Sequence, residues 1–119
     1  MMILIAEDNA LMRRMVCSMV EDINPNIIEC DDGGTAINLF ERHRPDWVLM
    51  DISMRPVDGL AATREIVEKF PGALVVIVTD HDDEATRARA FEAGACEFIG
   101  KHDLLPLRPL ISEQAVPEI

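Results

Sequence analysis

The sequence predicts an α/β protein in which five parallel strands form an open, doubly wound sheet with helices on both faces. Five short apolar runs alternate along the chain with longer segments in which apolar residues recur at helical spacing. Three of these runs are apolar throughout, as is typical of parallel strands that helices cover on both sides. The 119 residues are enough for one domain with a single sizeable core.

The strands and helices can be placed in order. The predicted strands occupy residues 2–6, 27–30, 47–50, 74–78 and 96–99. Helices are expected around residues 11–20, 33–43, 57–70 and 82–94. A fifth helix, with Asp103 as its N-cap, should be short or bent because Pro106 and Pro109 fall within it.

Two of the helices carry clear signals. In the first, apolar residues repeat every four positions and predict a broad buried stripe, made of Leu11, Met12, Met15, Val16, Met19 and Val20. In the fourth, Asp82, Asp83 and Glu84 should lie in the first turn, where they complement the helix dipole. Gly94 then predicts a left-handed end to that helix.

Composition excludes several classes of protein. The chain has 22 acidic and 11 basic residues and a net charge of −11, so it is not expected to bind nucleic acid, which is held mostly by Lys and Arg. It has neither a membrane-length apolar run nor the basic start of a signal peptide, which predicts a soluble cytoplasmic domain without a membrane partner. Cys17, Cys30 and Cys96 lie among apolar residues and are expected to be reduced core thiols.

Polar residues follow the predicted strands where each strand ends. Glu7 and Asp8 follow the first strand, Asp51 the third and Lys101 the fifth, while Thr79 ends the fourth. In doubly wound sheets the carboxyl ends of the strands form the ligand site, so these side chains should meet at one edge. Three crowded carboxylates favour a hard divalent cation, and Mg²⁺ is the natural candidate. Such a site can transfer a phosphoryl group to one carboxylate.

A second acid pair, Asp31 and Asp32, ends the second strand. It should reach the same edge of the sheet on the far side of the first strand. We interpret this pair as part of a loop.

The motifs "ILIAEDNALMR", "VLMDISMRPVDGL", "VVIVTDHDD" and "EAGACEFIGK" occur in this order. Together they resemble the receiver domain of bacterial two-component response regulators, and the resemblance covers about residues 2–112. It implies the flavodoxin-like strand order 2-1-3-4-5, a receiver domain at 1–112 and a tail or linker start at 113–119. It also implies that the chain is not an enzyme and catalyses only its own phosphorylation and dephosphorylation.

The resemblance assigns roles to individual residues. It implies that Asp51 is the phosphoacceptor, that Asp8 and Asp51 bind Mg²⁺ directly, and that Glu7 binds it mainly through water. The carbonyl of Ser53 is the third protein ligand that it implies.

Two further residues contact the phosphoryl group in the family. Here they would be Thr79 and Lys101. The resemblance also makes Thr79 and Phe98 the pair that switches conformation. His81, two residues after Thr79, corresponds to a position that modulates the reaction in the family.

The sequence departs from the usual family pattern at three places. Arg55 stands where many receivers have Pro, so the loop over the site should differ in shape, and Phe98 replaces the commoner Tyr. Lys101 is followed by His102 instead of Pro, and a cis bond at a non-proline residue costs about 2.5 to 4 kcal/mol, so we expect a trans peptide there.

The resemblance also implies partners. A sensor histidine kinase or a phosphotransfer protein would supply the phosphoryl group. The expected output surface lies on the fourth helix, fifth strand and fifth helix, and includes Arg87, Arg89, Glu97 and residues 104–111. A partner or a second receiver would bind there, and Leu104 and Arg89 are expected to be needed for that contact.

The residues around Asp51 also bear on three other interpretations. A haloacid-dehalogenase-type phosphatase needs an acid two residues after its nucleophilic Asp, and that position is Ser53. A flavodoxin-like flavin carrier needs a phosphate-binding loop and stacking aromatics, which "AEDNALM" and the lack of Tyr do not provide. A degenerate receiver that binds partners without phosphorylation remains the alternative.

Overall fold

The computed structural model describes residues 1–115 and contains one sheet of five parallel strands. The strands are β1 (Ile3–Ala6), β2 (Ile27–Cys30), β3 (Trp47–Met50), β4 (Val75–Thr79) and β5 (Glu97–Gly100). The helices are α1 (Ala10–Val20), α2 (Gly33–His43), α3 (Gly59–Lys69), α4 (Glu84–Ala93) and α5 (Leu107–Ala115). The strand order is β2-β1-β3-β4-β5, and the predicted fold class is confirmed.

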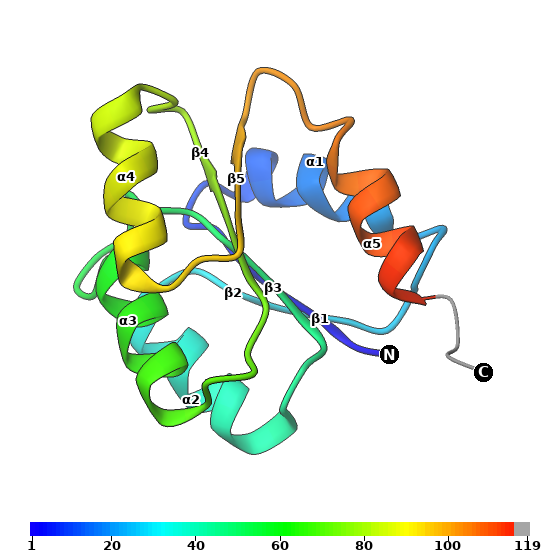
Figure 1. Cartoon of the computed structure of the whole chain (residues 1–119). Coiled ribbons are helices and arrows are strands. Elements are labelled where there is room, and N and C mark those ends of the chain that lie inside the picture. The colour runs from blue at the N-terminus through cyan, green and yellow to red at the C-terminus, as the bar shows by residue number, and fades with distance from the viewer. Residues whose placement is uncertain (116–119) are drawn as a thin grey trace.

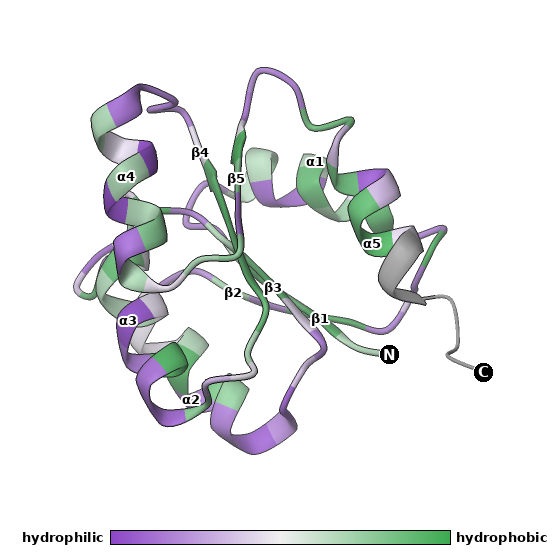
Figure 2. Ribbon diagram, viewed as in Figure 1, coloured by the Kyte–Doolittle hydropathy of each residue, from purple (hydrophilic) through white to green (hydrophobic). Residues whose placement is uncertain are grey.

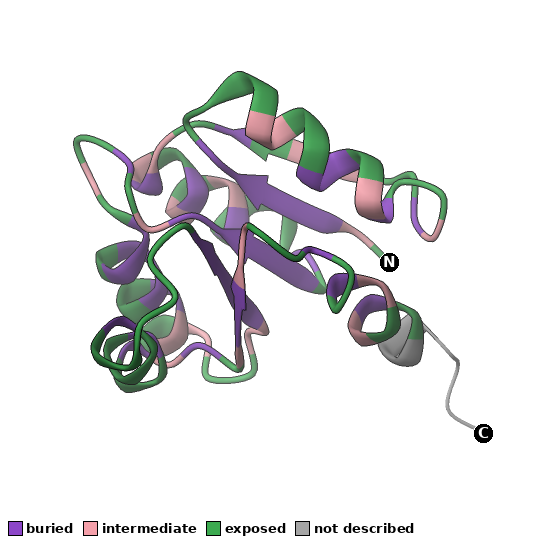
Figure 3. Cartoon of the chain, turned by 90° about the horizontal axis from the view of Figure 1, so that it is seen from above, coloured by how far each residue is buried: buried purple, intermediate pink, exposed green. Residues whose placement is uncertain are grey.

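The sheet separates two hydrophobic cores. Helices α1 and α5 cover one face, and α2, α3 and α4 cover the other (Figure 1). Alternate residues of one strand enter different cores, as Val48 packs toward α2–α4 and Leu49 toward α1 and α5. The three central strands β1, β3 and β4 are therefore apolar nearly throughout, and they form the buried centre of the domain, whereas the edge strands β2 and β5 are partly exposed (Figures 2 and 3).

Four helices begin behind an Asn or Asp whose side chain accepts a hydrogen bond from the backbone three residues later. These N-caps are Asn9, Asp32, Asp58 and Asp83. Asp32 therefore begins α2, and α3 begins two residues later than predicted. Of the three acids predicted in the first turn of α4, Glu84 lies there, whereas Asp82 and the N-cap Asp83 precede the helix. Gly94 ends α4 with a φ of 108° as predicted.

Helix α5 begins later than the sequence predicts. Asp103 is not its N-cap, because its carboxylate accepts a bond from the Leu105 N–H in the turn before the helix. Pro106 directly precedes α5, and Pro109 lies in its first turn, where a missing N–H removes no helical bond. The helix continues to Ala115, past the predicted domain end at residue 112, and the rest of the predicted tail, 116–119, lies outside the described residues.

The predicted stripe of α1 is only half correct. Val16 and Val20 are buried, but Leu11 and Met15 are exposed on the outer side of the helix. Cys17 and Cys30 are buried thiols as predicted, and burial raises the pKa of each to about 11. Cys96, in contrast, is exposed. Across residues 1–115, the longest apolar helical stretch falls short of what a bilayer crossing requires.

Candidate functional site

The carboxyl ends of β1, β3, β4 and β5 bring the predicted polar residues together. Asp51 directly follows β3, and its N–H donates to the Ala6 carbonyl of β1 at 2.9 Å, which fixes its backbone beside that strand. Glu7, Asp51 and Thr79 are all buried, although each is polar. Lys101 follows β5 and reaches the same edge of the sheet. The predicted cluster of acid, hydroxyl and ammonium groups is therefore present.

Lys101 is the counterion of two buried carboxylates. Its Nζ lies 2.7 Å from Glu7 Oε1 and 3.1 Å from Asp51 Oδ1, and its side chain is only 7% exposed. A buried carboxylate without a partner would cost several kcal/mol, so this ammonium makes the burial of both acids tolerable. The ion pair with Lys101 explains how a charged residue, Asp51, can lie buried directly after the apolar strand β3.

The electrostatics of the three groups are coupled. Burial raises the pKa of Glu7 and of Asp51 above the usual carboxyl values, and the hydrogen bond to Lys101 only partly offsets it. Burial would lower the pKa of Lys101, but its bonds to Glu7 and Asp51 outweigh this effect and raise that pKa. Burial thus makes both carboxylates costly to ionise, and Lys101 offsets only part of that cost.

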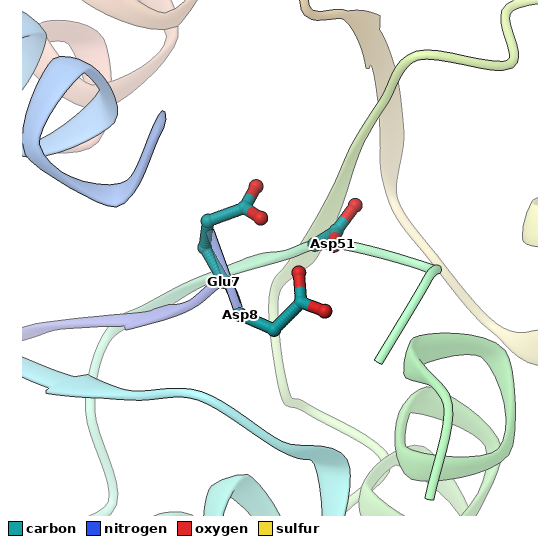
Figure 4. A group of neighbouring side chains, drawn as sticks. All are labelled: Glu7, Asp8 and Asp51. Atoms are coloured by element: carbon teal, nitrogen blue, oxygen red, sulfur yellow. The ribbon is translucent and has the colours of Figure 1, made fainter. Parts of the chain in front are cut away.

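Asp8 completes an acidic cluster that fits a divalent cation. One carboxylate oxygen from each of Glu7, Asp8 and Asp51 lies within 4.8 Å of the others, and the three side chains surround one space (Figure 4). Asp51 Oδ2 is buried and has no hydrogen-bond partner among the described residues. Three carboxylates against one ammonium, with one buried oxygen unpaired, fit the oxygen ligands and charge that Mg²⁺ requires.

A hollow of about 620 Å³ opens beside the acidic cluster. It is lined by the exposed Asp8 together with Ser53 and Arg55 from the loop after β3. Asp31 and Asp32 line it too, so this acid pair borders the site. Of the three acids in the cluster, Asp8 is the one that lines this hollow.

The model of the response regulator receiver domain family matches residues 3–106. The chain belongs to this family. The predicted resemblance is thereby confirmed, and the strand-end cluster lies within the matched receiver.

Relatives of this receiver include whole regulators and single domains. The chemotaxis protein CheY of Halobacterium salinarum is 32% identical over 99 residues, 83% of this chain and 82% of that protein. Transcriptional regulatory protein PdtaR of Mycobacterium tuberculosis is 38% identical over 109 residues, 87% of this chain and 53% of that protein. The receiver spans 43% of transcriptional regulatory protein DegU of Brevibacillus brevis, and about half the length or less of other relatives.

Solved structures show the same architecture. A DNA-binding response regulator of the LuxR family from Staphylococcus aureus superposes with a TM-score of 0.84 at 25% identity, covering 94% of this chain and 96% of that chain. CheY in the CheX–CheY complex from Borrelia burgdorferi gives a TM-score of 0.86 at 24% identity, covering 98% and 90%. The second likeness concerns the fold alone.

Thr79 and Phe98, the predicted switch pair of the receiver, lie on the neighbouring strands β4 and β5. Thr79 Oγ1 accepts a hydrogen bond from the His81 N–H at 3.0 Å, and the Lys101 N–H donates to the Thr79 carbonyl at 2.8 Å. Phe98 is buried, and the Arg87 guanidinium carbon lies 5.7 Å from its ring centroid. His81 itself is exposed at the rim.

Gly59, eight residues after Asp51, packs directly against the main chain of that residue. A Cβ at Gly59 would overlap the carbonyl oxygen of Asp51, because α3 begins directly against the loop that leaves β3. The Gly59 N–H also donates to the Ile52 carbonyl at 2.9 Å. The backbone of Asp51 is thus held by β1 on one side and by the first turn of α3 on the other.

The predicted output surface of the receiver needs two corrections. Arg87 and Glu97 line one hollow between α4, β5 and α5, as expected, but Arg89 points toward α3, where it lines another with Arg64. Leu104 is buried in the core under α5 and presents no contact surface. Altering Leu104 would therefore affect folding before it affected partner binding.

The peptide after Lys101 agrees with the prediction. The one cis peptide among residues 1–115 is Arg55–Pro56, so Lys101–His102 is trans. His102 is exposed, and its Nδ1 lies 3.3 Å from Asp82 Oδ2 in the loop after β4. The two loops that follow β4 and β5 are joined by this contact.

The sequence analysis did not identify two charged residues near the site, Asp80 and Arg13. Asp80 Oδ2 lies 3.9 Å from Lys101 Nζ, and its place directly after Thr79 was a usable signal. Arg13 donates from Nη1 to the Glu7 carbonyl at 2.7 Å and pairs through Nε with Glu29 Oε1 at 3.2 Å. Nothing in the local spacing separates Arg13 from its neighbour Arg14, so only the fold could identify it.

Proposed function

We propose that this receiver accepts a phosphoryl group on Asp51 in a Mg²⁺-dependent reaction and uses it to change a partner-binding surface. The proposal rests on the environment of the Asp51 carboxylate. One of its oxygens is held by Lys101 at 3.1 Å, and the other is buried without a partner beside two further acids. A structural carboxylate would use both oxygens, whereas a nucleophile needs one free.

The reaction follows from the positions of these groups. An Asp51 oxygen forms a bond to phosphorus while the bond from phosphorus to the donor breaks, and the donor is a phosphohistidine or a small acyl phosphate. Mg²⁺ held by Asp8 and Asp51, with Glu7 through water and the Ser53 carbonyl, would supply positive charge beside the transferring oxygens. Lys101 would add its ammonium charge beside Asp51 Oδ1, which lies 3.1 Å from its Nζ.

Thr79 would bind a phosphoryl oxygen in the phosphorylated state. Its hydroxyl lies at the end of β4 and accepts a bond from the exposed loop at His81, which it can exchange for one to a phosphoryl oxygen. Movement of Thr79 changes the packing of Phe98 on β5, where Arg87 covers the ring. Because Phe98 lacks a hydroxyl, packing and this cation–π contact hold its inward position.

The output surface is the hollow of about 410 Å³ between α4, β5 and α5. Arg87, Glu97, His102 and Leu110 are among its lining residues. A kinase, a phosphotransfer protein or a second receiver would bind there with an affinity that depends on phosphorylation. A ligand that fully reverses a two-state equilibrium must supply about 5 kcal/mol of differential stabilisation, and a smaller coupling gives a graded response.

The exposed side of α1 supports docking of the phosphoryl donor. Leu11 is 73% exposed and Met15 is 46% exposed, one turn apart on the helix that directly follows the acid pair. Exposed apolar side chains of this size beside a reaction site favour contact with a partner helix. Residue Leu105, also exposed, lies in the loop between β5 and α5.

Intact-protein mass spectrometry tests the proposal. The chain is incubated with acetyl phosphate, with and without Mg²⁺, and is expected to gain the mass of one phosphoryl group only when Mg²⁺ is present. Asp51→Asn should gain none, while the matched control Asp103→Asn, which changes an exposed acid in the loop before α5, should behave as the parent does.

The alternative function gives the opposite result. A receiver that binds partners without phosphorylation would show no Mg²⁺-dependent mass change. Uptake by Asp51→Asn equal to that of the parent would also refute Asp51 as the acceptor.

A further inference from the structure

Arg13 joins three parts of the chain near the acidic cluster. It lies one turn into α1, where its N–H donates to the Asn9 carbonyl at 2.9 Å. Its Nη1 donates to the Glu7 carbonyl at 2.7 Å, and its Nε lies 3.2 Å from Glu29 Oε1 on β2. The side chain is 24% exposed, so the guanidinium is largely enclosed between these groups.

The Glu7 carbonyl lies where β1 leaves the sheet. The Glu7 N–H still donates to Cys30 of β2 at 3.0 Å, and the Ala6 carbonyl still accepts from Asp51 next to β3. Beyond this point the neighbouring strands offer no further ladder bond to the Glu7 carbonyl, which accepts instead from Arg13. A charge-assisted bond of this length is stronger than an ordinary backbone bond.

This carbonyl belongs to the peptide that links Glu7 and Asp8. The side chains on either side of that peptide supply two of the three carboxylates in the cluster. Rotation of the peptide would turn both carboxylates relative to Asp51. Its orientation therefore decides whether the three oxygens face one space.

We infer that Arg13 is a positioning residue that fixes the Glu7–Asp8 peptide so that both acids face a bound divalent cation. The inference rests on the proposed Mg²⁺-dependent function. Arg13 touches neither the cation nor the phosphoryl group, and it acts through the main chain. Its second contact, with Glu29, steadies the guanidinium from the side of β2.

Calorimetric titration of the unphosphorylated chain with Mg²⁺ alone tests this role. Loss of a group that orients metal ligands typically weakens metal binding by 10- to 100-fold, and we expect Arg13→Gln to weaken Mg²⁺ binding about 10-fold. Arg14→Gln is the matched control, because Arg14 is the exposed neighbour on the same helix, and it should bind as the parent does. Arg13→Lys keeps one cationic donor and should bind more tightly than Arg13→Gln.

Glu29→Gln separates the two contacts of Arg13. It removes the charge partner on β2 but leaves the bond to the Glu7 carbonyl, so Mg²⁺ binding should stay close to that of the parent. Thermal unfolding in EDTA shows whether each variant keeps its fold in the absence of the metal. Under the inference, Arg13→Gln keeps an unfolding temperature close to that of Glu29→Gln while its metal affinity falls.

The outcomes separate this inference from the proposed function. If the parent binds Mg²⁺ but Arg13→Gln binds as tightly as Arg14→Gln, the positioning role is wrong and the proposed function stands. If Glu29→Gln weakens Mg²⁺ binding as much as Arg13→Gln, the effect comes from the tie between α1 and β2, and the positioning role is again wrong. If the parent does not bind Mg²⁺, both are wrong.

Discussion

Replacing Lys101 by Met tests the electrostatics of the site most directly. Met retains most of the buried stem of the side chain but removes the ammonium that lies 2.7 Å from Glu7 and 3.1 Å from Asp51. At an effective dielectric constant near 20, each contact corresponds to a gross attraction of about 5 to 6 kcal/mol. Desolvation of the ammonium offsets several kcal/mol of this sum, and removing one partner of a buried pair typically costs about 3 to 5 kcal/mol.

We therefore expect Lys101→Met to lower the free energy of unfolding by about 3 to 5 kcal/mol at pH 7.5 in EDTA. The measurement is urea unfolding followed by the fluorescence of Trp47, which is the only Trp and is buried. The deficit should shrink when Mg²⁺ is added, because the cation replaces part of the missing positive charge. It should also shrink on acidification, because protonated Glu7 and Asp51 no longer need a counterion.

Lys69→Met is the matched control. Lys69, the only other lysine, also lies near two carboxylates, 3.5 Å from Glu41 and 3.5 Å from Glu65, but all three side chains are about half exposed. Solvent screens such pairs, so its loss should leave stability unchanged within error. A deficit for Lys101→Met as small as that for Lys69→Met, or one that does not change with pH, would refute the assignment of Lys101 as the counterion.

Three other predictions concern the same site. Burial raises the pKa of Asp51 in the folded state, so ionised Asp51 destabilises the fold at pH values above that pKa and has no such effect below the pKa of the unfolded chain. Asp51→Asn should therefore have a higher urea midpoint of unfolding than the parent at pH 7.5 in EDTA, and the difference should narrow toward pH 4. Equal midpoints at both pH values would contradict this. His81→Ala should change the rate at which the phosphorylated protein loses its phosphoryl group several-fold, about 1 kcal/mol in barrier, because His81 lies at the rim beside Thr79. The rate is followed by intact mass, and an unchanged rate would exclude a role of His81 in dephosphorylation. Arg87→Ala should weaken the inward packing of Phe98 and should therefore alter partner affinity more in the phosphorylated than in the unphosphorylated state. Titration of a partner against both forms measures this. Equal changes in affinity for the two forms would indicate that Arg87 only contacts the partner.

The sequence predicted those parts of the fold that depend on local pattern. Unbroken apolar runs identified the strands, and the residues after them identified the cluster, because strand ends in a parallel sheet share one edge. The pattern could not decide which of two adjacent rows on α1 faces the sheet, and Met15 proved exposed while Val16 is buried. Burial depends on the distance and tilt of the helix against the sheet, which periodicity does not contain.

One error was avoidable, and two features were not predictable. Arg87 and Arg89 lie two residues apart on a helix and so project about 200° apart, which excludes a shared surface. The sequence placed Lys101 and Glu7 at the same edge of the sheet, but it did not indicate that Lys101 Nζ would lie closer to Glu7, at 2.7 Å, than to Asp51, at 3.1 Å. The bond from Arg13 to the Glu7 carbonyl joins a side chain to a main-chain atom. No residue pattern along the chain encodes contacts of these kinds.

The close approach of Gly59 to Asp51 also determines which sequence changes this domain can accumulate over evolutionary time. Every side chain at position 59 would displace the main chain of Asp51, so selection acting only on signalling would still remove such changes. Gly72 lies in the turn after α3, and a Cβ there would meet nothing within 4 Å. Descendants of this chain should therefore drift freely at position 72 and keep glycine at position 59, and pooled variants selected for phosphate uptake would reveal the same contrast within one experiment.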